Sequence, residues 1–168
     1  MIPRIIHFVW VGGTEVPVAV EKCWASWKQH NEKFRVMMWR DEDITPERFP
    51  ITYQLMYRCR GPAQAKDILM FEILFRYGGF YVDSDMICVN GLTPFIDQNS
   101  TLVVSDAFGK VWNKREAAAA DPPHPCDNSF VGCVVGHSAM MDAMLALRER
   151  STVRWNRIEV NEETGPFF

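Results

Sequence analysis

The sequence predicts one α/β domain in which helices flank a mostly parallel central sheet. Short β-favouring runs alternate along the chain with segments of helical periodicity, the pattern of strand–helix–strand units. Glycine pairs at 12–13 and 78–79 separate these elements, as turn residues do. With 168 residues, of which 48% are hydrophobic and 23% charged, we expect a single globular domain over residues 1–168.

The first forty residues predict two strands with a helix between them. The apolar run over 5–10 (IIHFVW) ends at Gly12-Gly13, which is typical of a buried strand that leads into a turn. Apolar residues then recur at helical spacing over 17–29. A second β-favouring run over 34–39 ends in an acidic loop or helix cap at 41–43.

The longest predicted helix is almost entirely apolar. It begins at Pro62, ends at Tyr77 before Gly78-Gly79, and has almost no polar face, so we expect it to be buried. The remaining expected elements are a loop or short helix over 109–125, helices over 53–59 and 138–148, and strands over 80–82, 101–105 and 130–135.

The overall charge and the cysteines exclude several classes of protein. The net charge of −3, from 18 basic and 21 acidic residues, argues against broad nucleic-acid binding. We expect no transmembrane segment, because no run approaches the ~20 apolar residues that cross a bilayer. The five cysteines are odd in number and form no Cys-x-x-Cys pair, and the N-terminus lacks a signal-peptide layout. We therefore expect reduced thiols and a cytoplasmic protein.

Two aspartates follow the strand expected after the second glycine pair. Asp83 and Asp85 are two positions apart, so both side chains point the same way in extended backbone. Their carboxylates repel unless a cation lies between them, and oxygen ligands suit Mg²⁺ or Mn²⁺ with substrate phosphates. Ligands of α/β sheets bind outside the carboxyl ends of strands, where this pair lies. A solvated turn is the alternative, because Asp-x-Asp also occurs by chance.

Asp67 and Trp10 are further candidates. Asp67 lies near the start of the apolar helix, where a carboxylate either complements the helix dipole or approaches Asp83. Trp10, at the end of the first strand, offers an aromatic face to a base or sugar, and core packing is its alternative role.

The segments over 2–13, 65–69, 77–85, 128–132 and 164–166 carry a family resemblance. In this order they resemble the DXD-containing sugar transferases of glycosyltransferase family 32, and are similar to the glucosyltransferase domains of the large clostridial toxins. The resemblance implies a GT-A fold. It also implies transfer of a hexose from a nucleotide diphosphate sugar, commonly linked to UDP, to an acceptor hydroxyl on a glycan or protein.

The resemblance also implies roles for individual residues. Trp10 would stack on the nucleobase, and Asp67 would bind donor sugar or ribose hydroxyls. Asp83 would contact ribose and metal, and Asp85 would ligate Mn²⁺ or Mg²⁺ directly. The other residues implied in the nucleotide-sugar site are Val9, Gly79, Tyr81 and Ser84, with Asp127 and Asn128 near the anomeric carbon.

The implied mechanism is retaining. The metal would neutralise the departing diphosphate as the sugar becomes oxocarbenium-like, and the acceptor hydroxyl would attack from the same face. An inverting enzyme would instead need a carboxylate base, for which Asp127 and Asp106 are the candidates. One departure from the family is Met70, where many relatives carry Arg, which leaves the donor identity open. The chain is also short for this fold, so we expect either a compact donor-binding core or a fragment of a longer protein.

Two other functions are compatible with Asp83 and Asp85. A phosphohydrolase could use Asp83 as nucleophile and Asp85 as acid, although it would give the glycine pair and the Trp10 segment no role. A non-catalytic module that binds nucleotide sugars or glycans could also hold a metal through these aspartates.

Overall fold

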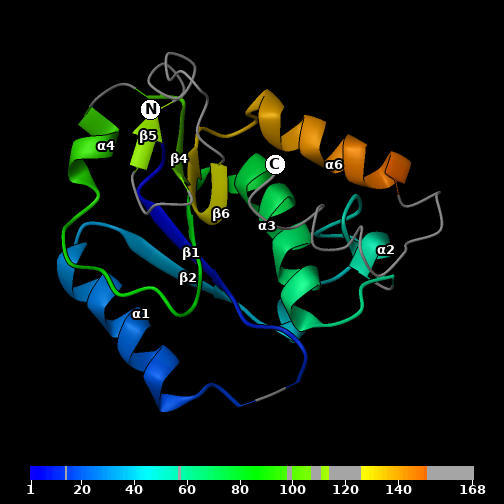
Figure 1. Ribbon diagram of the computed structural model, residues 1–168, viewed down its shortest axis with the longest axis horizontal. Coiled ribbons are helices and arrows are strands. Elements are labelled where there is room, and N and C mark those ends of the chain that lie inside the picture. The colour runs from blue at the N-terminus through cyan, green and yellow to red at the C-terminus, as the bar shows by residue number, and fades with distance from the viewer. Residues whose placement is uncertain (14, 57, 98–99, 107–110, 114–125, 151–168) are drawn as a thin grey trace.

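A computed structural model describes residues 1–13, 15–56, 58–97, 100–106, 111–113 and 126–150. The resemblance segment 164–166 and most of 109–125 therefore lie outside the described residues. The described chain forms one sheet with helices on both faces (Figure 1). Its elements are β1 Ile5–Val9, α1 Val18–His30, β2 Arg35–Trp39, η1 Asp41–Asp43, α2 Tyr53–Met56, α3 Pro62–Tyr77, β3 Gly79–Val82, α4 Thr93–Asp97, β4 Leu102–Asp106, β5 Val111–Asn113, β6 Cys126–Cys133 and α6 Ser138–Arg150.

The described sheet has six strands in the order β2-β1-β3-β6-β4-β5. β1 pairs in parallel with both β2 and β3, whereas β6 lies antiparallel between β3 and β4. β5 pairs antiparallel with β4 at the edge. β2, β1, β3 and β4 consequently run in one direction, which confirms the expected α/β fold with a mostly parallel sheet and adds that β6 and β5 run against it.

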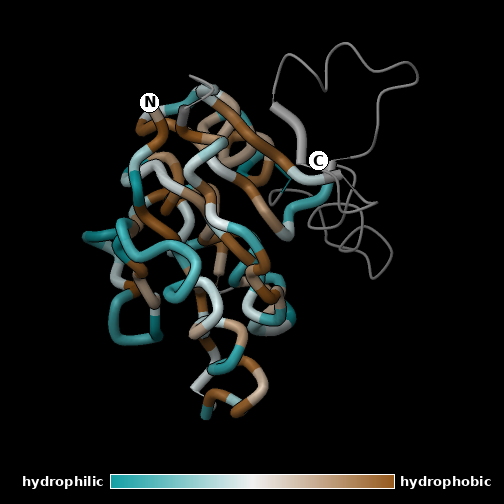
Figure 2. The backbone as a smooth tube through the Cα atoms, turned by 90° about the vertical axis from the view of Figure 1, so that its left-hand side faces the viewer, coloured by the Kyte–Doolittle hydropathy of each residue, from teal (hydrophilic) through white to brown (hydrophobic). Residues whose placement is uncertain are grey.

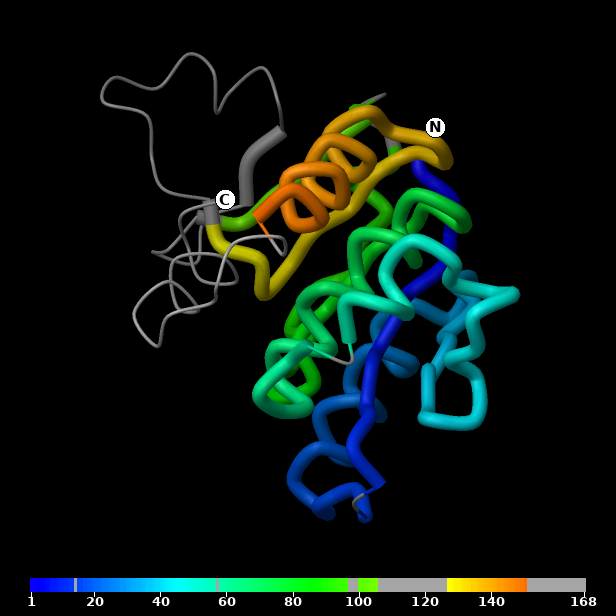
Figure 3. Tube along the Cα trace, turned by 90° about the vertical axis from the view of Figure 1, so that its right-hand side faces the viewer, coloured from blue at the N-terminus to red at the C-terminus, as the bar shows by residue number. Residues whose placement is uncertain are grey.

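Two hydrophobic clusters cover the two faces of the sheet. On one face α3 and α6 pack together, and the fully buried Leu69, Ile73 and Met144 belong to this cluster. On the other face Trp24 and Trp27 of α1 pack against Phe8 of β1 and Phe130 of β6. Figure 2 shows the apolar strands inside and hydrophilic loops around them, and Figure 3 shows α6 lying along α3. No described helix is long and apolar enough to span a bilayer.

The differences from the expected elements lie mainly in the second half of the chain. β6 begins at Cys126, four residues before the expected strand, because its first residues pair with β4 across a register shift. Part of the segment expected as a loop or short helix is strand β5, which Val111–Asn113 form along β4. The short helix α4 was not expected from the sequence. Strand pairing is a non-local contact, which explains why local periodicity misses the first two of these features.

The glycine pair before β3 is needed for a close approach of two strands. Gly78 and Gly79 both have positive φ, at 58° and 91°, which L side chains rarely adopt. A Cβ at Gly79 would lie 2.6 Å from the carbonyl oxygen of Ile5. The His7 ring connects this turn to Trp39 of β2. Its Nδ1 accepts a hydrogen bond from Trp39 Nε1 at 3.1 Å. Because tryptophan only donates, Nε2 carries the proton and donates to the Gly78 carbonyl at 2.8 Å.

We predict that His7 makes the fold sensitive to acid. Burial lowers the pKa of His7 to about 4, so the native state prefers the neutral ring. The stability from this preference is fully present above the unfolded pKa near 6.5 and is lost as the pH falls toward 4. Between pH 7 and pH 4.5 the wild type should lose about 2–3 kcal/mol more unfolding free energy than His7→Gln, measured by urea denaturation. Equal losses in the two proteins would contradict this prediction.

Candidate active site

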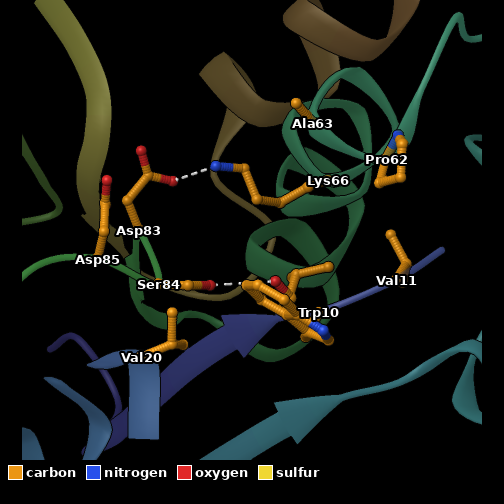
Figure 4. A pocket seen from close by; sticks show the side chains of 10 residues that line it. Trp10, Val11, Val20, Pro62, Ala63, Lys66, Asp83, Ser84 and Asp85 are labelled. Atoms are coloured by element: carbon orange, nitrogen blue, oxygen red, sulfur yellow. Dashed lines mark hydrogen bonds and ion pairs between the residues drawn. The ribbon is translucent and has the colours of Figure 1, made fainter. Parts of the chain in front are cut away.

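A cavity of about 440 Å³ opens where β1 and β3 end and α3 begins (Figure 4). It is the size of small-molecule sites in proteins. Its lining residues are Val9, Trp10, Val11, Val20, Pro62, Ala63, Lys66, Asp83, Ser84 and Asp85. The parallel pairing of β1 with β3 places the residues after the two strands side by side. The Ser84 hydroxyl donates to the Val9 carbonyl at 3.3 Å and joins the two strand ends.

Asp83 and Asp85 lie in a turn directly after β3 rather than in an extension of the strand. The Met86 N–H donates to the Asp83 carbonyl at 3.1 Å and closes this turn. The Asp83 carboxylate accepts the Tyr81 hydroxyl at 2.7 Å, and the Asp83 N–H donates to the Ser129 carbonyl of β6 at 2.8 Å. Asp85 is exposed at the cavity mouth, and Figure 4 shows both carboxyl groups on the same side of the turn.

Tyr81 reaches Asp83 from inside the sheet. Complete burial and the nearby charge of Asp83 raise the pKa of Tyr81 well above its usual value. The hydroxyl therefore stays protonated and acts as a fixed donor to Asp83. This arrangement holds one oxygen of Asp83 in place and leaves the other oxygen, Oδ2, for a further contact.

Lys66 and Asp67 of α3 bring charges of opposite sign close to Asp83, and of the two only Lys66 lines the cavity. Lys66 Nζ lies 2.7 Å from Asp83 Oδ1 and 3.7 Å from Asp67 Oδ1. Burial, aided by the charge of Asp83, raises the pKa of Asp67 to about 6, although Lys66 and a hydrogen bond with the Asn128 side chain oppose the shift. Asp67 is therefore a carboxylate that is only partly stabilised in its charged form. The partner in this hydrogen bond, Asn128, belongs to β6, the strand that pairs antiparallel with β3.

Trp10 forms the apolar side of the cavity. Its ring is partly exposed and meets the Trp24 ring edge-on, at 6.3 Å between centroids and 80° between planes. The backbone N–H of Trp10 donates to the Trp39 carbonyl at 2.9 Å, which fixes the backbone as it leaves β1. The Trp10 ring lines the cavity together with the aliphatic side chains of Val11 and Val20.

The loop after Trp10 is tied to the protein at two points. The Asp41 carboxylate accepts the N–H groups of Gly12 and Gly13, with a shortest distance of 2.8 Å. Both glycines have positive φ, so their amides converge on one anion. A Cβ at Gly12 would lie 2.5 Å from Pro62 Cγ, which shows how closely the loop packs on the start of α3.

The remaining sequence candidates lie at the edge of the site or away from it. Gly79 lies at the other end of β3 and is not among the lining residues. Asp127 accepts the Ser129 hydroxyl at 2.7 Å and the Ser129 N–H at 3.1 Å. Met70 is 1% exposed in the core beneath the site, so this position contributes no charge. The Asp106 side chain lies outside the described part of the structure.

Sequence reasoning missed Lys66 as a site residue, together with the helix start formed by Pro62 and Ala63. Lys66 was visible only as a neighbour of Asp67, and no local pattern predicts an ion pair with a residue 17 positions later. The sequence did predict that α3 begins at Pro62. The first N–H groups and the dipole of this helix place partial positive charge on the cavity wall opposite Asp83 and Asp85.

The donor set fits a hard divalent cation that keeps most of its ligands from water or phosphate. Asp83 and Asp85 offer carboxylate oxygens at an open mouth. Among the described residues, no three His, Cys, Asp or Glu side chains form a closed metal cage. Mg²⁺ and Mn²⁺ commonly bind in this way, through one or two carboxylates and the phosphates of a substrate.

We predict that Asp67 costs the empty protein stability. Its pKa is raised from 3.8 to about 6, so its contribution to stability falls as the pH rises through that range. Asp67→Asn should therefore raise the unfolding free energy at pH 7.5 by about 1–3 kcal/mol in EDTA, with a smaller gain at pH 5. Thermal melts at both pH values measure this difference. A lower melting temperature for the variant at pH 7.5 would contradict the prediction.

The chain is similar to known proteins over the segment that contains Asp67, Asp83 and Asp85. A family model described as "Glycosyltransferase sugar-binding region containing DXD motif" matches residues 17–102, more than half of the chain, and includes Asp67, Asp83 and Asp85. An uncharacterized glycosyltransferase of Acanthamoeba polyphaga mimivirus is 32% identical over 101 residues, covering 57% of this chain and 40% of the relative. Inositol phosphoceramide mannosyltransferase 3 of Schizosaccharomyces pombe is 24% identical over 173 residues, covering 99% of this chain and 43% of the relative.

The fold also matches a solved structure. The PaToxG glycosyltransferase superposes with a TM-score of 0.71 at 17% identity, over 98% of this chain and 66% of that one. This likeness confirms the expected GT-A fold. The chain spans about 40% of the length of the curated relatives named above. By its match to the family model, the chain belongs to the family of glycosyltransferase sugar-binding regions that contain a DXD motif.

Proposed function

We propose that the protein is a metal-dependent glycosyltransferase that moves a hexose from a nucleotide diphosphate sugar to an acceptor hydroxyl on a glycan or protein. The observation that carries this proposal is that the aromatic ring of Trp10 and two carboxylates, Asp83 and Asp85, line the same cavity. A nucleotide sugar has matching parts: a flat base, a diphosphate that binds metal, and a sugar rich in hydroxyl groups.

The nucleotide would lie across the cavity. Trp10 would stack on the base, and Val9 and Ser84 would line the passage between the strand ends. Tyr81 would keep Asp83 oriented toward the ribose and the diphosphate through its 2.7 Å hydrogen bond. Apolar surface on one side and fixed charges on the other would set the direction in which the nucleotide binds.

Asp83 and Asp85 would hold Mn²⁺ or Mg²⁺. When bound, such an ion neutralises the charge that develops on the departing diphosphate. The start of α3 lies across the cavity and would place its N–H groups and dipole toward the same phosphates. The protein would thus stabilise the leaving group from both walls, which lowers the barrier to breaking the sugar–phosphate bond.

The sugar would lie beyond the diphosphate, toward β6. Asp67 and Asn128, which are joined by a side-chain hydrogen bond, would accept and donate hydrogen bonds to its hydroxyl groups. Asp127 would lie next to the reacting carbon. Both of its carboxylate oxygens already accept hydrogen bonds from Ser129. We therefore propose attack from the donor's own face with retention, which needs no carboxylate base on the opposite face.

The proposal is tested by thermal melting with UDP, GDP and their sugars, with and without Mn²⁺. GDP-mannose is included because one relative is named a mannosyltransferase. A ligand present at a hundred times its Kd should add about 2.7 kcal/mol. We expect one nucleotide to raise the melting temperature, and Mn²⁺ to increase that rise. The increase due to Mn²⁺ should be abolished in Asp85→Ala and kept in Cys59→Ala, whose half-buried thiol lies outside the cavity lining.

The ligand that stabilises the protein then defines the turnover assay. Incubation of its sugar form with candidate acceptors should yield a glycoside whose anomeric proton, read by NMR, has the configuration of the donor. A product of inverted configuration would contradict retention alone. Failure of every nucleotide to shift the melt, or an unchanged shift in Asp85→Ala, would contradict the proposed function.

A second prediction concerns the stacking residue. Trp10→Ala should weaken nucleotide binding by roughly tenfold or more, because base–aromatic stacking contributes about 1–3 kcal/mol per base. Trp10→Phe should recover most of that loss, since it keeps a ring in the same place. Isothermal calorimetry with Mn²⁺ measures both variants. Equal affinity in wild type and Trp10→Ala would remove Trp10 from the base site.

A further inference from the structure

Lys66 places a positive charge directly beside Asp83 in this site. Its Nζ lies 2.7 Å from Asp83 Oδ1, the same oxygen that accepts the Tyr81 hydroxyl. The Lys66 and Asp83 side chains are each 22% exposed, so the pair lies largely out of bulk water. A charge-assisted hydrogen bond of this length, in a partly buried place, is one of the stronger polar contacts that a side chain makes.

Lys66 places its positive charge between two carboxylates. Its Nζ lies 2.7 Å from Asp83 Oδ1 and 3.7 Å from Asp67 Oδ1. Among the described residues that line the cavity, it has the one basic side chain. Without this residue, a diphosphate would enter a cavity whose described lining carries two carboxylates, Asp83 and Asp85, and no basic side chain.

The ammonium ion also has hydrogen-bonding capacity to spare on the cavity side. Of its three N–H bonds, one is directed at Asp83, and the Asp67 oxygen at 3.7 Å is beyond hydrogen-bond distance. Figure 4 shows the side chain extending from α3 toward the end of β3, across the cavity from Trp10. Lys66 belongs to α3, and the first residues of that helix, Pro62 and Ala63, also line the cavity. A phosphate group here would meet the helix start and the lysine together.

We propose that Lys66 is a built-in cation of the donor site: it neutralises Asp83 in the empty protein, and its ammonium ion binds the diphosphate group of the donor. The inference rests on the proposed function and adds a specificity-determining residue to it. Two consequences follow from the geometry. A nucleoside diphosphate binds measurably without any divalent ion, and Lys66 competes with a divalent ion for Asp83.

The test compares Lys66→Met with Lys66→Arg and Lys33→Met. Lys66→Met keeps the aliphatic stem but removes the charge, and Lys66→Arg keeps the charge. Lys33→Met makes the same change at an exposed lysine that precedes β2, at the end of the parallel strands away from the cavity. Binding of UDP and GDP is measured by calorimetry in EDTA and again with Mn²⁺. Binding of Mn²⁺ to the empty protein is measured by electron paramagnetic resonance, which needs no nucleotide and no activity.

We expect wild type, Lys66→Arg and Lys33→Met to bind one of the nucleotides in EDTA, and Lys66→Met to bind it at least about tenfold more weakly. The empty Lys66→Met protein should bind Mn²⁺ about tenfold more tightly than wild type, because Asp83 has lost its competing cation.

Two results would overturn the inference and leave the proposed function standing. The first is nucleotide binding that requires Mn²⁺ in the wild type. The second is Mn²⁺ affinity that Lys66→Met leaves unchanged. Binding of neither nucleotide under any condition would contradict the inference and the proposed function together. Circular dichroism of each variant confirms that it is folded before these affinities are compared.

Discussion

The parallel pairing of β1 with β3 is the constraint on which the rest of the site depends. It places the turn that holds Asp83 and Asp85 beside the residue that leaves β1, Trp10. The pairing needs a residue without a side chain at Gly79, because a Cβ there would meet the Ile5 backbone. The close contact of Gly79 with Ile5 at the start of β3 therefore helps to bring Trp10 and the two aspartates together at the other end of the strands. A displaced β3 would separate the aromatic face from the carboxylates, even with every site residue present.

The site concentrates like charges that the empty protein accommodates at a cost. Asp83 is satisfied by a buried tyrosine and a lysine, whereas Asp67 is held partly buried against a neighbouring carboxylate. Functional sites commonly retain such unfavourable groups, because a ligand relieves them on binding. A divalent ion and the hydroxyls of a sugar are the groups that would relieve this one. The same charges that weaken the empty fold would thus supply part of the binding energy for the donor.

Local patterns predicted the elements that carry the candidate site. The order of apolar helix, glycine turn and strand placed Pro62 at the start of α3, and Asp83 and Asp85 directly after β3, as the structure has them. Contacts between elements were beyond local patterns. The Lys66–Asp83 ion pair depends on how α3 packs beside β3, and the early start of β6 depends on pairing with β4. Periodicity predicts which face of its own helix or strand a residue occupies. Which residue of another element it contacts depends on how the whole domain packs.

The position of the positive charge links the family resemblance to this chain's own chemistry. The resemblance predicts Arg at position 70, yet Met70 is 1% exposed among apolar side chains and belongs to the core. Lys66 lies four residues earlier, one turn toward the start of α3 and on nearly the same side of the helix. The lysine is closer to the cavity mouth, where it reaches Asp83 rather than the core. In the proposed site, a positive charge at position 66 would act on the diphosphate and on Asp83, whereas one at position 70 would act on a deeper part of the donor. The choice of residue 66 therefore bears directly on how far this site depends on a divalent ion.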